Sequence, residues 1–93
     1  MKSSITPQPT ISTLRLPKVV QQTGRSRASL YSDINEGTFP PPIKYTQRCV
    51  AWPDYEVNAI VRARIAGKSD DEIRCMVAEM IEARSRILGE GGQ

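Results

Sequence analysis

Two helical patterns in this sequence are separated by only three residues, and that short break restricts the fold more than any other feature. Apolar residues at helical spacing predict a helix over 17–23 and a second helix over 27–36. Gly24 suits the left-handed residue that ends a helix, and Ser26 suits the residue whose side chain caps the next one. Helices joined this closely pack against each other, so the sequence predicts a helix-turn-helix.

The segment that follows predicts a β-hairpin. Three consecutive prolines, Pro40–Pro42, exclude a helix and a central strand there. The runs 43–45 and 49–52 are typical of short strands, and residues 46–48 form the turn between them. Because an isolated hairpin is marginally stable in water, its apolar side has to pack on the helices, with Trp52 in the core.

Two further helices are predicted in the rest of the chain. Pro53 suits the first turn of a helix that Gly67 ends. The run from Ser69 to Glu72 matches a capping box and predicts a last helix over 70–88. The expected fold is mostly α with a small β-hairpin: a winged helix-turn-helix followed by an additional C-terminal helix.

These elements divide the chain into four parts. Residues 1–13 are rich in Ser, Thr and Pro, and we expect them to form a flexible N-terminal arm. Residues 14–67 are the winged helix-turn-helix domain, 68–88 the amphipathic C-terminal helix and 89–93 a frayed tail.

The last helix carries apolar residues at alternating spacings of three and four over about two heptads, too few to identify a coiled coil. Two interpretations remain open: the helix folds back as a lid on its own domain, or it joins two copies in a homodimer, the preferred reading. The residues expected at such a dimer contact are Ile73, Met76, Val77, Met80 and Ile87.

Composition excludes several functional classes. The 93 residues include no histidine, which removes Ser-His-Asp and Cys-His catalysis and most zinc sites, so we expect no enzyme activity, no metal and no cofactor. No apolar run approaches the length of a membrane span, and no secretory signal is present, so we expect a cytoplasmic protein. The cysteines, Cys49 and Cys75, are expected to be small buried residues.

Charge is distributed unevenly along the chain. Residues 1–66 contain nine basic and four acidic residues, whereas residues 67–93 contain four basic and six acidic residues. A basic body indicates an anionic partner, and a helix-turn-helix places its second helix in the major groove of double-stranded DNA. The candidate DNA-contacting residues are Arg25, Ser26, Arg27, Ser29, Tyr31 and Ser32 on the turn and second helix, and Lys44, Thr46, Gln47 and Arg48 on the wing.

Some of these candidates also have an alternative structural role. Arg27 has the planar fork that pairs with guanine, and Ser26 is expected to cap its helix. Tyr31 remains open between a core residue and a phosphate contact, and Ser29 between a plain helix-surface serine and a base contact.

Several of these residues together resemble a known family. The run T-G-x-S-R-x-S-L-Y over residues 23–31, followed by G-x-F-P at residues 37–40 and by Trp52, resembles the AlpA family over about residues 14–66. That family comprises transcriptional regulators of phages and prophages, close to excisionases and to the MerR-type DNA-binding fold. The resemblance implies DNA contacts at Ser26, Arg27, Ser29, Tyr31 and the wing around Arg48. The wing turn lacks the glycine common in the family, and Ser32 replaces a residue that is usually basic.

The function expected from these observations is sequence-specific regulation of transcription from a phage, prophage or other mobile element. One alternative is an excisionase-like architectural factor that bends DNA. A second is an anti-repressor that binds a phage or host protein through the helix over 70–88.

Overall fold

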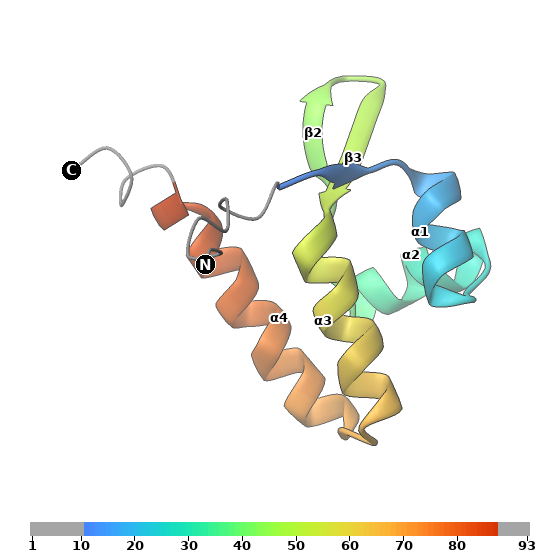
Figure 1. The fold of residues 1–93 in the computed structure, drawn as a ribbon, viewed down its shortest axis with the longest axis vertical. Helices are drawn as coiled ribbons and strands as arrows, with labels where there is room; N and C mark the ends of the chain where they lie inside the picture. Colours follow the sequence, from blue (N-terminus) through green and yellow to red (C-terminus); the bar gives the residue numbers. More distant parts are fainter. Residues whose placement is uncertain (1–10, 88–93) are drawn as a thin grey trace, which may run out of the picture.

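The computed structural model describes residues 11–87, which form four helices and a small antiparallel sheet (Figure 1). This confirms the expected fold class, and the predicted tail at 89–93 lies outside the described residues. The elements in chain order are β1 (Thr13–Leu14), α1 (Leu16–Thr23), α2 (Arg27–Glu36), β2 (Ile43–Thr46), β3 (Cys49–Pro53), α3 (Asp54–Ile65) and α4 (Asp70–Arg84).

The signals that predicted the helix ends act as expected. Gly24 and Gly37 follow α1 and α2 with φ of 72° and 83°, in the left-handed region that glycine adopts without strain. The Ser26 hydroxyl accepts a hydrogen bond from the Ser29 backbone N–H at 3.1 Å. At the start of α4, Ser69 and Glu72 cap each other's backbone N–H groups, and these hydrogen bonds from Ser69 hold the pKa of Glu72 below its usual value.

The sheet contains one strand that the sequence did not predict. β3 lies in the centre, with β2 on one side and β1 on the other. Thr13 pairs with Pro53, and the Ser12 carbonyl accepts a hydrogen bond from the Asp54 backbone N–H at 2.8 Å. The expectation of a flexible arm extending to residue 13 is therefore wrong at its C-terminal end, because the open edge of β3 offers backbone groups with which this segment pairs.

Trp52 lies at the centre of the core, as predicted. Its side chain is fully buried, and its indole N–H donates to the Pro40 carbonyl at 2.8 Å. The ring of Phe39 meets the indole edge to face, with 6.2 Å between the ring centroids. Around these two rings pack Val19, Leu30, Val57, Ile60, Ala63, Ile73 and Val77.

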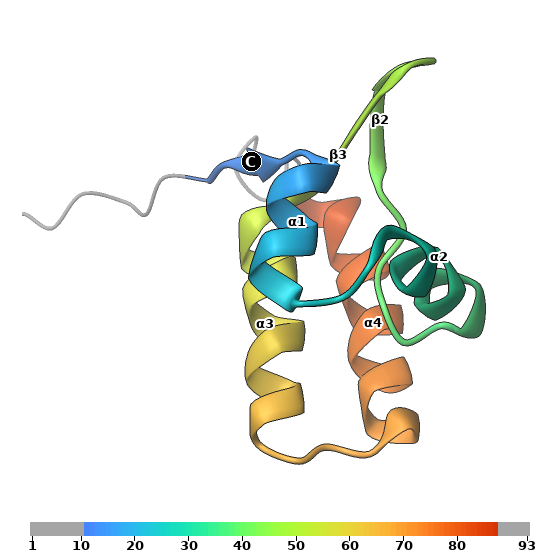
Figure 2. The same cartoon turned by 90° about the vertical axis from the view of Figure 1, so that its right-hand side faces the viewer.

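Helix α4 folds back on its own domain, antiparallel to α3 (Figure 2). Ile73 and Val77 are buried in the core of the same chain, so the expectation that they form a dimer contact is wrong in this conformation. The helix also ends at Arg84 rather than at residue 88, because the Glu82 carbonyl accepts from both the backbone N–H and the hydroxyl of Ser85, a tighter turn than an α-helix makes.

The cysteines do not follow the expectation that both are buried. Cys49 is half-buried, Cys75 is exposed on α4, and both are free thiols.

No helix in residues 11–87 is long and apolar enough to cross a membrane.

A buried ion pair that the sequence did not predict joins α3 to α4. The Glu56 side chain is fully buried, and both of its carboxylate oxygens accept from Arg84, at 2.9 Å from Nε and 2.6 Å from Nη2. The same Nη2 donates to the Pro41 carbonyl at 2.7 Å. Arg84 thereby connects α4 to α3 and to the proline segment.

Removing one partner of this pair is expected to destabilise the protein strongly. Arg84→Met leaves the Glu56 carboxylate buried without its cation, and we expect the free energy of unfolding to fall by roughly 3 kcal/mol, measured by urea denaturation. The double variant Glu56→Met/Arg84→Met removes both charges, and it should recover much of that loss. A double variant as unstable as the sum of the two single variants would contradict this account of the pair.

Candidate nucleic-acid interface

Five exposed side chains of α2 lie on one face of the helix. They are Arg27, Ala28, Tyr31, Ser32 and Asn35. Their spacing of one, three, one and three residues keeps them within less than half of the helix circumference. Leu30, on the opposite side, is buried in the core, and Ile34 packs against it. The structure thus presents a polar face of α2 to solvent, with a single cation near its N-terminal end.

Tyr31 belongs to this exposed face rather than to the core. Its side chain is 38% exposed, and Tyr31 does not belong to the set of residues that form the hydrophobic core. Of the two interpretations left open by the sequence, the position of Tyr31 favours a surface contact, because the phenol is free to meet a phosphate.

Ser26 and Ser29 are used within the chain. The Ser26 hydroxyl donates to the Ser29 hydroxyl at 2.9 Å, in addition to accepting from its backbone N–H. Ser29 is half-buried and points away from the five residues of the exposed face. The geometry favours a capping role for Ser26 and a plain helix position for Ser29.

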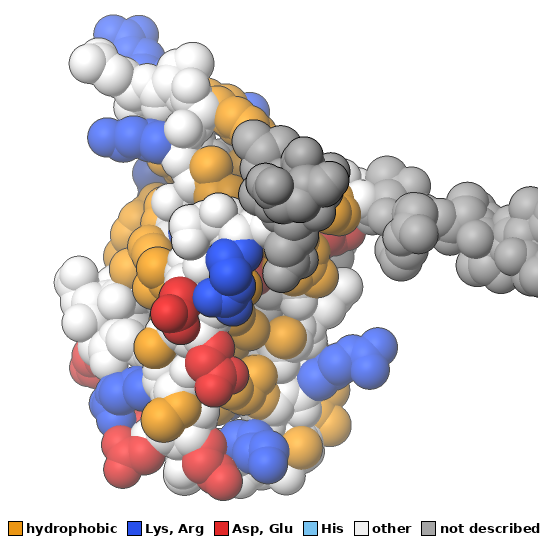
Figure 3. Space-filling view, turned by 90° about the vertical axis from the view of Figure 1, so that its left-hand side faces the viewer, with side chains coloured by type: hydrophobic (Ala, Val, Ile, Leu, Met, Phe, Trp, Pro, Cys, Tyr) orange, Lys and Arg blue, Asp and Glu red, His pale blue; other side chains and the backbone are white. Residues whose placement is uncertain are grey.

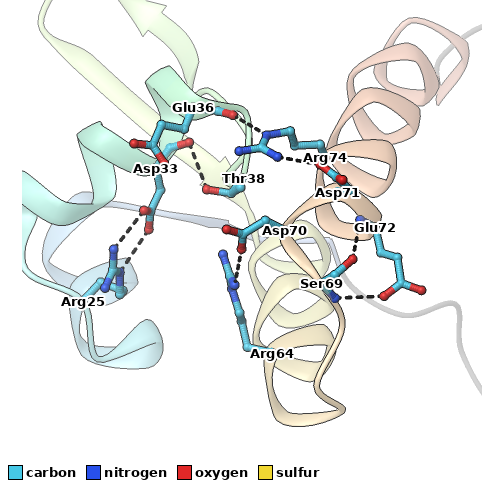
Figure 4. A network of polar contacts seen from close by, with 10 residues as sticks. All are labelled: Arg25, Asp33, Glu36, Thr38, Arg64, Ser69, Asp70, Asp71, Glu72 and Arg74. Carbon is cyan, nitrogen blue, oxygen red and sulfur yellow. Dashed lines mark hydrogen bonds and ion pairs between the residues drawn. The ribbon is translucent and has the colours of Figure 1, made fainter.

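Arg25 in the turn is held by an ion pair. Its guanidinium donates to both carboxylate oxygens of Asp33, at 2.9 Å and 3.0 Å (Figure 4), and these hydrogen bonds raise the pKa of Arg25 above its ordinary value. The guanidinium stays half exposed, so the pair is weak enough to exchange for another anion. Arg25 therefore occupies the expected place, with a partner that the sequence analysis did not identify.

The β2–β3 hairpin projects from the same side of the molecule as α2 (Figure 2). Its exposed end carries the four residues predicted for the wing, Lys44, Thr46, Gln47 and Arg48. The turn forms without a glycine: no residue other than glycine has a positive φ in the described chain, and the pairing register shifts between Lys44 and Thr46. The Thr46 hydroxyl closes the turn by accepting from the backbone N–H groups of Arg48 and Cys49.

Tyr45 is a surface residue of the wing that the sequence analysis did not single out. Its ring is 57% exposed, and its hydroxyl donates to the Thr13 hydroxyl of β1 at 3.0 Å. No local signal identifies this contact, because the two residues are 32 positions apart. The hydrogen bond attaches the wing to the strand on the other side of the sheet.

Helix α4 contacts the C-terminal end of α2. The Arg74 Nε donates to the Glu36 carbonyl at the end of α2, at 2.9 Å, while its Nη1 pairs with Asp71 (Figure 4). Gly37 lies against the Arg74 side chain, such that a Cβ there would be 3.6 Å from the Arg74 Cγ. A cation at a helix C-terminus interacts favourably with the unpaired carbonyls, so Arg74 stabilises the end of α2.

Comparisons with known proteins identify a family and one similar phage protein. A sequence model of the family described as "Prophage CP4-57 regulatory protein (AlpA)" matches residues 12–65. The relative "Uncharacterized protein ORF88" of Enterobacteria phage P4 is 42% identical over 55 residues, which are 59% of this chain and 62% of that protein. The chain thus spans less than two thirds of that relative's length. No solved structure matches.

We expect Arg74→Met to loosen the end of α2 while leaving the rest of the fold intact. Methionine keeps the side-chain stem against Gly37 and removes the hydrogen bond to Glu36, which contributes about 0.5–1 kcal/mol. The amides of Gly37 and Thr38 should then exchange with solvent deuterium about two- to fivefold faster. Cys75→Ser, at the next, exposed position of α4, is the control, and equal exchange in both variants would contradict the capping role.

Proposed function

The chain belongs to the AlpA family of prophage regulatory proteins, and from that premise we propose that it is a sequence-specific DNA-binding regulator of a phage, prophage or other mobile element. The family match covers residues 12–65, which include β1, both helices of the helix-turn-helix, the hairpin and all of α3. The proposal places the chain on double-stranded DNA in a bacterial cell.

One observation carries the proposal: α2, which has a polar face exposed to solvent, and the β2–β3 hairpin lie on the same side of the molecule (Figure 2). A winged helix-turn-helix uses this arrangement to insert its second helix into the major groove while the hairpin reaches the neighbouring backbone or minor groove. In this geometry Arg27 and Asn35 are the side chains of α2 best suited to base edges. Lys44 and Arg48 supply cations for phosphates.

The contacts within the chain refine this assignment. Arg27 is the direct reader in the proposal, because its guanidinium takes part in no ion pair or side-chain hydrogen bond among the described residues. Arg25 is a conditional contact, since a phosphate has to compete with Asp33. Ser26 supports binding indirectly by keeping the first turn of α2 formed.

An excisionase-like architectural role uses the same contact surface. It differs in that the bound DNA is bent and neighbouring sites are filled cooperatively, so the bend angle of a bound fragment distinguishes the two roles. An anti-repressor acting through α4 receives less support, because the apolar residues Ile73 and Val77 of that helix are buried in the core.

Arg27→Ala tests the base contact. We expect a loss of about 1–3 kcal/mol in binding to the preferred duplex, selected from a random library, together with relaxed preference at one base pair. Binding to a scrambled duplex should change much less, because that binding depends on phosphate contacts. Arg86→Ala removes the same charge from the exposed end of the C-terminal helical segment and is the matched control. Equal losses on both duplexes would refute direct readout by Arg27.

Arg48→Ala tests the wing. A phosphate contact predicts weaker binding to all sequences alike and a slope of log K against log salt that is lower by about one unit. The measurement is a titration of the preferred and scrambled duplexes at several salt concentrations, again with Arg86→Ala as control. A slope that stays the same would show that the wing does not contact phosphate.

A further inference from the structure

Two stripes of side chains follow the outer edge of the hairpin formed by α3 and α4. The stripe on α3 comprises Tyr55, Ala59, Arg62 and Ala66. The stripe on α4 and the helical turn after it comprises Met76, Met80, Ala83 and Ile87. Both stripes have the spacing four, three, four, which keeps their members on one side of each helix. All eight except Arg62 are apolar or aromatic, and none is fully buried.

The two stripes form one continuous surface, which we call the hairpin face. Tyr55 and Ile87 line the same hollow, of about 340 Å³, at one end of the hairpin. The helices are antiparallel, so seven residues forward from Tyr55 on α3 and seven residues back from Ile87 on α4 reach the same height. Arg62 therefore lies level with Met80. Figure 3 shows the result as a strip of hydrophobic side chains that runs beside the acidic side chains of α4.

This surface is suited to close contact with another helical surface. Ala59, Ala66 and Ala83 are small, so a neighbouring backbone can approach closely. Met76 and Met80 pack against the core on one side and are partly exposed to solvent on the other. Tyr55 and Ile87 remain 43% and 49% exposed. A contiguous apolar strip of this kind on a surface marks an interaction site rather than a solvated face.

Charges on the two edges of the hairpin face indicate what covers it. The outer edge of α4 carries Glu72, Glu79 and Glu82 against the single cation Arg86, so it is acidic. The outer edge of α3 and the loop after it carries Arg62 and Lys68 and is basic, since Arg64 is paired with Asp70. A surface with one acidic and one basic edge is complementary to itself when turned by a two-fold axis parallel to the helices.

We propose that the hairpin face binds a second copy of this chain. The two-fold axis places α3 of one copy against α4 of its partner, so that each basic edge meets an acidic edge. Arg62 then lies level with Glu79 of the partner copy. Neither residue takes part in an ion pair within the described chain, so both are available for this contact.

The size of the face sets the expected strength of association. Helices of 12 and 15 residues are about 18 and 22 Å long, so the two copies bury an area near the lower limit for a specific dimer. We therefore expect a dissociation constant in the micromolar range. Neither stripe includes any of the five residues on the exposed face of α2, so the contact leaves that face free.

Sedimentation equilibrium with charge-reversal variants tests the proposal, over about 1 to 300 µM, a range that includes a micromolar dissociation constant. The wild-type chain should be a dimer at the upper concentrations. Arg62→Glu and Glu79→Arg should each weaken association at least about tenfold, since each places like charges opposite each other. The double variant Arg62→Glu/Glu79→Arg should restore it. A wild-type chain that is monomeric throughout, or a double variant no better than the single variants, would overturn the proposal.

Two further variants separate the hairpin face from other surfaces. Ala83→Glu adds bulk and charge at an exposed position of the face and should abolish association. Ile81→Gln changes an apolar residue of α4 that is 45% exposed and lies on the side of the helix turned away from the stripe and from Glu79, so it should leave association unchanged. Thermal unfolding of each variant verifies the fold. Loss of association by Ile81→Gln, or unaltered association by Ala83→Glu in a folded chain, would contradict the assignment of the face. All measurements omit DNA, so their outcome is independent of the proposed DNA-binding function.

Discussion

Hydrogen bonds to two carbonyl groups of the proline segment, Pro40–Pro42, fix the position of the β2–β3 hairpin relative to α2, the two parts of the proposed DNA-binding surface. Pro40 accepts from the Trp52 indole and Pro41 accepts from Arg84, at 2.8 and 2.7 Å. The prolines have no N–H and restricted φ, so this segment joins neither a helix nor the sheet ladder and depends on side chains for its hydrogen bonds. Because it connects α2 to β2, those two bonds set where the wing stands relative to α2.

Helix α4 is consequently an integral part of the folded domain, although the family match ends at residue 65, before α4 begins. It contributes Ile73 and Val77 to the core and donates arginine hydrogen bonds to backbone carbonyls at both ends of the connection between α2 and β2. A domain this small buries a limited fraction of its surface, and the extra helix adds to that burial through Ile73 and Val77. The side of α4 that faces away from the core is then free to serve self-association.

Much of the fold could be predicted from the sequence, since its signals act over three or four residues. The left-handed glycine at 24, the cap at Ser26 and the box at Ser69 each specify a helix end through contacts with near neighbours. The burial of Trp52 followed from the need to anchor a marginal hairpin. For the candidate interface, the two helices and the hairpin could be predicted from the sequence, whereas the ion pair of Arg25 with Asp33 and the orientation of Ser29 away from the exposed face of α2 could not.

What local sequence signals specified was therefore the order, the ends and the exposed faces of the helices and of the hairpin. Only the folded chain decided which distant groups meet: Thr13 with Pro53, Tyr45 with Thr13, and Arg84 with Glu56, the last pair 28 positions apart. The physical reason is the range of the interactions. A helix cap or a periodic stripe depends on residues within about one helical turn. A buried carboxylate or an open strand edge pairs with a complementary group from another element, and the packing of the whole elements decides which group that is.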